Sequence, residues 1–181
     1  MNEKLNYLYT QLENSRRDLI NDLTRFDAQQ LVIPPASGKW SVSQVFYHLN
    51  KAEALSMVYV SKKMLDVNNL KVTGVKESLK LAGLGLLFNS PLKFKVPIEA
   101  LGEMPENVDY TDIVNQWNDT RVKLKSFLDA LPEDILRKNV FKQPAIGRQN
   151  IYQMVEFMQM HFNRHKKQVN RIVYPITIRK S

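Results

Sequence analysis

The sequence holds three histidines, and two of them are spaced so that they could bind the same metal ion. His161 and His165 lie four residues apart in a segment predicted to be helical, so their side chains share one helical face with Cβ atoms about 5 to 6 Å apart. His48 lies far upstream in a second predicted helix. Three imidazoles around one tetrahedral ion would leave its fourth position open, which is typical of catalytic rather than structural zinc.

These histidines also have a simpler interpretation. A histidine on the apolar face of a helix commonly hydrogen-bonds to a neighbour in the core and binds no ion. The H-x-x-x-H spacing is only moderately specific for metals, and Phe162 stands where the H-E-x-x-H metalloproteases carry their glutamate, which excludes that class. All three histidines are predicted to face inward. The residues by themselves leave open both a metal site and a set of core hydrogen bonds.

Four long amphipathic segments would position the histidines. The second begins with the best-defined boundary, because Ser41 and Gln44 form a capping box pattern just before the apolar positions. Asn150 with Gln153 can cap the fourth in the same way. None of the four contains a proline. The predicted helices cover residues 3–26, from 41 to about 66 or 67, 111–131 and 151–173.

Helices without intervening strands predict an all-α fold, a four-helix bundle formed by a single domain over residues 1–181. The link after the first helix is short, so we expect the first and second helices to be antiparallel neighbours. A long crossover over residues 68–109 joins the second and third helices, and a short apolar helix is predicted within it at residues 76–88. Residues 140–147 are predicted to form a loop.

Composition excludes several classes of protein. The chain has no cysteine, so disulfides, thiolate metal sites and cysteine nucleophiles are excluded, and a cytoplasmic protein is expected. No segment is long and apolar enough to span a membrane, and the first residues do not resemble a secretory signal. The net charge of +8 is scattered rather than gathered in a stripe, so specific nucleic-acid binding is not expected.

Three short motifs, taken together, resemble the DinB superfamily, also described as DinB-like or YfiT-like metal-dependent hydrolases. They are residues 38–49 (Gly-Lys-Trp-Ser-Val-Ser-Gln-Val-Phe-Tyr-His-Leu), residues 144–147 (Pro-Ala-Ile-Gly), and the pair His161 and His165 followed by Gln168. The resemblance covers nearly the whole chain. It implies a four-helix bundle that binds a divalent metal ion, commonly nickel or zinc.

Within this resemblance, the metal ligands would be His48, His161 and His165, and none of them is substituted. Related members include thiol S-transferases that use bacillithiol, mycothiol or glutathione, and maleylpyruvate isomerase-like enzymes. The expected partner is therefore a small-molecule substrate, with a low-molecular-weight thiol as one candidate. A homodimer is left open.

The chemistry of such a site follows from the charge of the ion. A divalent ion held by three neutral imidazoles lowers the pKa of a bound water or thiol, which would support hydrolysis or thiol transfer. No side chain is identified as catalytic, because Glu53 and Glu156 each lie five residues from a histidine and about 140° around the helix. The alternative is a bundle that binds a metal or ligand without catalysing a reaction and serves as an interaction module.

Metal-binding imidazoles usually donate their second N–H to an acceptor that fixes the ring. Two amides are candidates for this role, Gln44, four residues before His48, and Gln168, three residues after His165. Each could equally lie at the edge of the bundle and bind backbone groups or water.

Overall fold

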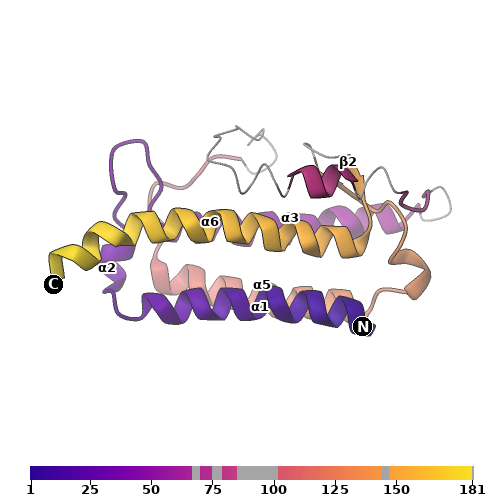
Figure 1. Ribbon diagram of the computed structural model, residues 1–181, viewed down its shortest axis with the longest axis horizontal. Coiled ribbons are helices and arrows are strands. Elements are labelled where there is room, and N and C mark those ends of the chain that lie inside the picture. The colour runs from indigo at the N-terminus through magenta and orange to yellow at the C-terminus, as the bar shows by residue number, and fades with distance from the viewer. Residues whose placement is uncertain (67–69, 75–78, 85–101, 144–146, 181) are drawn as a thin grey trace.

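The computed structural model describes residues 1–66, 70–74, 79–84, 102–143 and 147–180. Four long helices form the body of the molecule, and Figure 1 shows them stacked lengthwise. The prediction of a four-helix bundle is thus confirmed. The long helices are α1 (Glu3–Leu23), α3 (Val42–Met64), α5 (Tyr110–Asp129) and α6 (Ile151–Lys180). Shorter elements are α2 (Ala28–Leu31), the 3-10 helix η3 (Glu133–Ile135), and the strands β1 (Phe141–Gln143) and β2 (Gly147–Gln149).

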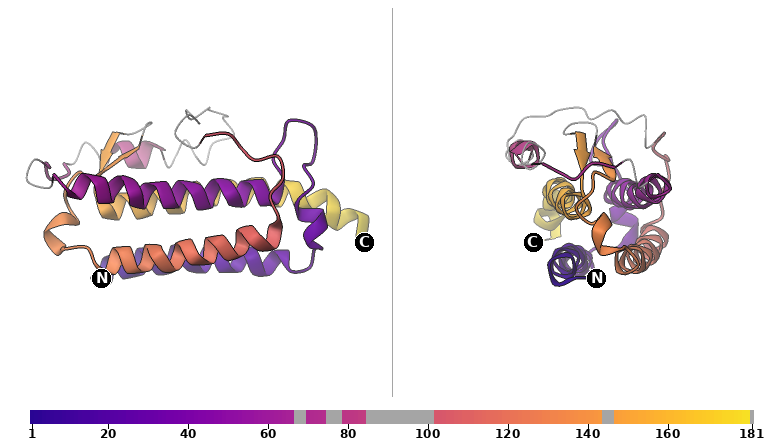
Figure 2. Two further views of the ribbon diagram at one scale, coloured as in Figure 1. Left: turned by 180° about the vertical axis from the view of Figure 1, so that it is seen from behind. Right: turned by 90° about the vertical axis from the view of Figure 1, so that its right-hand side faces the viewer.

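The order of the helices around the bundle differs from the expected one. Helix α1 packs against α5 and α6, and α3 packs against the same two helices, so α1 and α3 lie diagonally across the bundle, as the end-on view in Figure 2 shows. The prediction that the first and second helices are neighbours is therefore wrong, although the two helices do run antiparallel (Figure 2). Residues 24–41 between them form a link that includes α2, which is long enough to cross the end of the bundle.

Neighbouring helices run in the same direction in two of the four pairs. The start of α1 lies beside the start of α6, where the Asn2 amide donates to the Tyr152 hydroxyl over 2.6 Å. The far ends of α3 and α5 are also brought together, because Asn139 N donates to Lys71 O and Thr73 N donates to Arg137 O just beyond them. Helices α3 and α6 are antiparallel, and the early part of α3 faces the middle of α6 (Figure 2).

The predicted start of α3 is confirmed by both hydrogen bonds of the capping box. The Ser41 hydroxyl accepts from Gln44 N over 3.2 Å, and Gln44 Oε1 accepts from Ser41 N over 2.9 Å. The two side chains therefore satisfy backbone N–H groups that the first helical turn would leave unpaired. Asn150 and Gln153 form the same reciprocal pair at the start of α6. Local sequence thus fixes where both histidine-bearing helices begin.

Two predictions about the second half of the chain need correction. The segment predicted as a loop at residues 140–147 contains strand β1 and the first residue of β2, and the two strands are antiparallel, with Phe141 paired to Gln149 and Gln143 to Gly147. Residues 144–146 of that segment lie outside the described part. Helix α6 also continues past residue 173 and includes Pro175. Proline removes one backbone hydrogen bond from a helix, and Pro175 is exposed, so water can reach the carbonyl group left without a donor.

The core runs along the bundle axis and is centred on aromatic side chains from three helices. Trp117 of α5 is fully buried and lies 5.0 Å from the ring of Phe46 on α3 and 6.3 Å from that of Phe162 on α6. Burying side chains of this size stabilises the packing of the three helices. Phe46 and Phe162 come two residues before His48 and one residue after His161, so the core packing also fixes the histidine-bearing turns.

The crossover between α3 and α5 is only partly described. Residues 79–84 are helical and fall within the predicted segment 76–88, whose other residues, 76–78 and 85–88, lie outside the described part. Leu81 and Leu84 pack against Phe157 and Met160 of α6, which places this short helix over one side of the bundle. In the part of the chain that the structure describes, no helix is both long and apolar enough to cross a membrane.

Candidate metal centre

The antiparallel packing of α3 and α6 brings the three histidines together. His161 Nε2 lies 3.1 Å from His48 Nε2 and 3.1 Å from His165 Nε2. One ring nitrogen from each residue falls within 4.8 Å of the other two, so these side chains could hold a metal ion. His161 and His165 meet because they are one helical turn apart, whereas His48 reaches them across the interface between the helices.

The spacing of the nitrogens suits a small tetrahedral ion. Ligand nitrogens bound to zinc at 2.0 to 2.1 Å with tetrahedral angles lie about 3.3 Å apart. Both short Nε2 separations in the cluster are 3.1 Å, close to that value. Among the described residues, the cluster offers only imidazole nitrogens as ligand atoms. Such a set of ligands suits zinc, nickel and copper better than magnesium or calcium.

The three rings are also in the neutral form in which histidine binds metal ions. Burial lowers the pKa of His48 to about 4 and that of His165 to about 3. Burial, with the neighbouring His165 and His48, places the pKa of His161 well below 6.5. All three rings are therefore neutral at pH 7, and each carries a lone pair that can bind a cation.

Gln168 orients one of these rings. His165 Nδ1 lies 2.9 Å from Gln168 Oε1. Because an amide oxygen can only accept, Nδ1 carries the proton and Nε2 presents its lone pair to the cluster. This arrangement is the one that metal-binding histidines usually show, in which an acceptor on the far nitrogen fixes the tautomer.

Gln44 does not take the corresponding position beside His48. Its oxygen caps the backbone of Ser41, and its Nε2 donates to the carbonyl oxygen of Pro105 over 2.8 Å. The amide thus ties the start of α3 to the end of the crossover. Of the two positions left open for Gln44, the structure shows the one with backbone partners, because the capping box already uses the side chain.

Two aromatic side chains, absent from the predicted site, form walls around the histidines. The Trp40 ring lies 5.0 Å from that of His48 and 6.4 Å from that of His165, and is nearly parallel to the second. The Phe157 ring stacks on His161 at 5.7 Å with an interplanar angle of 7°. Both are partly exposed. Phe157 could have been found from its spacing, since it precedes His161 by one helical turn.

The two glutamates excluded by helical spacing do lie away from the cluster. Glu53 is buried on the opposite side of α3 and accepts from Trp117 and Arg121 of α5. Glu156 lines a pocket on another face of α6. The structure therefore brings together the three predicted ligands and Gln168, with no carboxylate in the cluster that the described residues form.

Solved structures of known proteins share this architecture. YfiT from Bacillus subtilis, described as a probable metal-dependent hydrolase with an unusual four-helix bundle topology, aligns with a TM-score of 0.61 and 13% identity, over 98% of this chain and 90% of its own. TT2238, described as a four-helix bundle protein, aligns with a TM-score of 0.57 and 16% identity, over 92% of this chain and 98% of its own. At these identities the likeness establishes the fold.

Sequence comparison identifies the family directly. No curated protein matches the chain. The sequence profile of the DinB superfamily, however, matches residues 11–169, which include all three histidines and all but the ends of the bundle. The chain belongs to the DinB superfamily.

Proposed function

We propose that this protein binds one divalent metal ion through His48, His161 and His165 and acts on a small-molecule substrate as a metal-dependent hydrolase. The observation that carries the proposal is the convergence of three neutral Nε2 atoms, with two separations of 3.1 Å. Zinc and nickel are the proposed ions, because both accept an all-imidazole ligand set. The published description of the structural neighbour YfiT as a probable metal-dependent hydrolase supports the same class.

When bound, the ion would supply positive charge that lowers the pKa of a water molecule and polarises the substrate. The protein's own contribution is orientation. Gln168 holds the His165 ring with its Nε2 lone pair toward the cluster. Trp40 packs against His48, Phe157 stacks on the face of His161, and the two aromatic rings shield the histidine cluster on two sides. Electrostatic interactions at the ion are stronger where water is excluded, because the local dielectric constant is lower.

Thiol transfer is a second candidate, and one observation favours it. The histidine cluster contains no carboxylate among the described residues that could act as a general base toward water. A thiol needs less help to ionise than water does, since its ordinary pKa is about 8.5. The chain has no cysteine, so the thiol would be a low-molecular-weight cosubstrate.

Metal content tests the first step. We expect tag-free protein incubated with zinc or nickel and then desalted to carry one ion per chain by elemental analysis. His161→Ala should lose stoichiometric metal, because its nitrogen lies between the other two. Asn163→Ala is a matched control on an exposed position of the same helix and should keep the metal. Wild-type protein without stoichiometric metal would contradict the proposal.

Activity tests the second step. The metal-loaded protein is screened with ester and amide substrates, and separately with bacillithiol, mycothiol or glutathione and an electrophile. Hydrolysis that is lost in His161→Ala supports the hydrolase, whereas thiol-dependent turnover with the same loss supports the transferase. Inactivity in both screens would favour a non-catalytic bundle that binds metal as part of an interaction module.

A further inference from the structure

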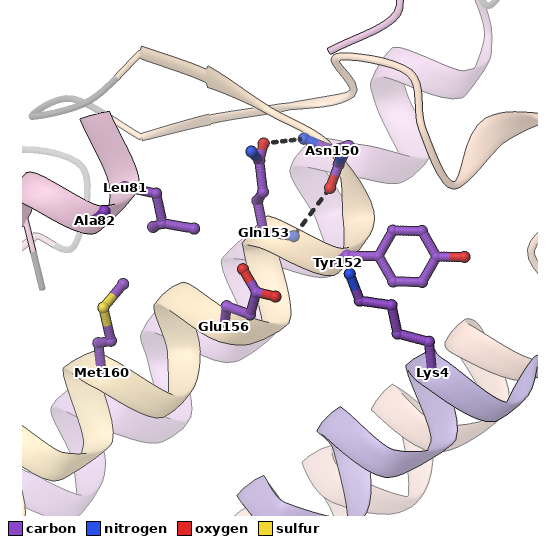
Figure 3. Close-up of a pocket in the computed structure, with 8 residues that line it drawn as sticks. All are labelled: Lys4, Leu81, Ala82, Asn150, Tyr152, Gln153, Glu156 and Met160. Atoms are coloured by element: carbon purple, nitrogen blue, oxygen red, sulfur yellow. Dashed lines mark hydrogen bonds between the residues drawn. The ribbon is translucent and has the colours of Figure 1, made fainter. Parts of the chain in front are cut away.

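A pocket lies on a different face of α6 from the histidines. Its volume is about 390 Å³, within the range of small-molecule sites. Three parts of the chain line it, namely the start of α1, the first turns of α6 and the helical residues 79–84, and Figure 3 shows the side chains that they contribute. The family resemblance assigns no role to this pocket.

Glu156 is the charged group at its centre. Its side chain rises from α6 into the space between Leu81 and Met160 on one side and Tyr152 on the other (Figure 3). Burial raises the pKa of this carboxyl, with the charge of Lys4 opposing the effect. Among the residues the structure describes, none donates a hydrogen bond to it or forms an ion pair with it. The carboxylate is partly buried and no protein group pairs with it directly, so a ligand that brings a positively charged donor can do so.

The nearby lysine does not fill this role. The Lys4 ammonium lies over the Tyr152 ring, 4.9 Å from its centre, in a cation–π contact. Lys4 is exposed, and Figure 3 shows it at the edge of the pocket. The pocket therefore offers one negative group and an apolar wall, formed by Leu81 and Met160, which pack together. The uncharged amides of Asn150 and Gln153 also line it.

We propose that this pocket binds a small organic ammonium ion, a primary amine that carries a short apolar chain. The ammonium group donates to the Glu156 carboxylate, and the chain lies against Leu81 and Met160. A charge-assisted hydrogen bond in a partly buried site is stronger than one in water. The site uses none of the three histidines, so it stands or falls independently of the metal centre.

Calorimetric titration with hexylammonium chloride tests the proposal, with hexan-1-ol and hexanoate as probes that share the chain and differ in charge. We expect hexylammonium to bind one per chain and the other two to bind more weakly. Glu156→Gln keeps the shape and removes the charge, and it should weaken hexylammonium binding about tenfold or more. Glu133→Gln, on an exposed residue of η3, is the matched control and should bind like wild type.

A second readout places the ligand. In protein with ¹³C-labelled methionine methyl groups, hexylammonium should shift the Met160 resonance in wild type and in Glu133→Gln. Equal affinity of Glu156→Gln and wild type, tighter binding of hexanoate, or an unmoved Met160 signal at saturation would each overturn the proposal.

Discussion

Two polar clusters lie in the same bundle, and they differ in how their charge is balanced. Between α3 and α6, three neutral imidazoles point their nitrogens at one another. Between α1, α3 and α5, buried acidic and basic side chains neutralise each other within the protein. We refer to the second group, Glu13, Arg16, Glu53 and Arg121, as the ionic cluster.

The inner end of the ionic cluster lies deep in the core. Arg121 Nη2 donates to Glu53 Oε1 over 2.8 Å, and Trp117 Nε1 donates to Glu53 Oε2 over 2.9 Å. Arg121 and Glu53 are only 2% and 3% exposed. Burial raises the pKa of Glu53, while the Arg121 charge and the two hydrogen bonds favour its ionised form. Each charge is tolerated in the core because the other is present.

The outer end reaches the surface between α1 and α5. Arg16 makes two hydrogen bonds to the Glu13 carboxylate, of 2.8 and 3.0 Å, and Arg17 adds one of 2.8 Å. Arg121 Nη1 lies 3.8 Å from Glu13 Oε2 and so links the two ends. Opposite charges thus continue from core to surface.

The two clusters differ in whether they contribute to stability or to binding. The ionic cluster contains its own counter-charges, so its loss should affect folding and leave metal binding intact. The histidine cluster contains lone pairs without a cation of its own, so changes there should affect metal binding with little cost to the metal-free fold.

The largest expected effect comes from Arg121→Met, which leaves the Glu53 carboxylate buried without its partner. We expect unfolding in urea to show a loss of about 3 to 5 kcal/mol, the range for breaking buried ion pairs. Lys123→Met, at an exposed position of the same helix, should change stability by less than about 0.5 kcal/mol. The folded Arg121→Met protein should still carry one metal ion per chain. Loss of metal in that folded variant would show that the two clusters are coupled.

Local signals account for what the sequence predicted correctly. The capping boxes at Ser41 and Asn150 and the helical spacing of His161 and His165 each involve residues within one turn, whose geometry the backbone fixes. His48 was placed correctly because it follows a well-defined helix start on the inward side. The family resemblance supplied the remaining step, that the two helices face each other.

Long-range contacts account for what was missed. The diagonal position of α1 and α3 depends on how the link between them crosses the bundle, which helical periodicity does not report. Glu53 and Arg121 are 68 residues apart in the chain. Glutamate and arginine are usually exposed, so neither residue type indicates a buried position. The two strands have only three residues each, which is too short for a recognisable alternating pattern in the sequence.

An intermediate effect is expected from Gln168→Ala, which removes the acceptor on His165 Nδ1. The ring can then rotate or adopt the other tautomer. Losing such a partner usually weakens metal binding about 10- to 100-fold. Competition with a chromogenic chelator measures the change. Asn170→Ala, exposed on the same helix, should bind metal like wild type. Unchanged affinity in Gln168→Ala would mean that packing by Trp40 alone orients the ring.

The smallest expected effect is at the outer end of the ionic cluster, and it depends on pH. Burial by itself would raise the pKa of Glu13, but the hydrogen bonds and charges of Arg16 and Arg17, with the charge of Arg121, outweigh it and hold the pKa below 4.5. A carboxyl whose pKa is lower in the folded state stabilises the protein above its unfolded pKa and loses that contribution as the pH falls through the folded value.

Glu13→Gln should therefore cost about 1 kcal/mol at pH 7, and the difference from wild type should shrink below pH 4. Urea unfolding of both proteins at several pH values measures it. Asp18→Asn, at an exposed position of the same helix, is the control and should show a smaller difference at pH 7. A Glu13→Gln penalty that stayed constant down to pH 3 would mean that the side chain contributes by packing. The outer end would then differ from the inner end in kind, because the paired charges of Glu53 and Arg121 would alone carry the electrostatic contribution.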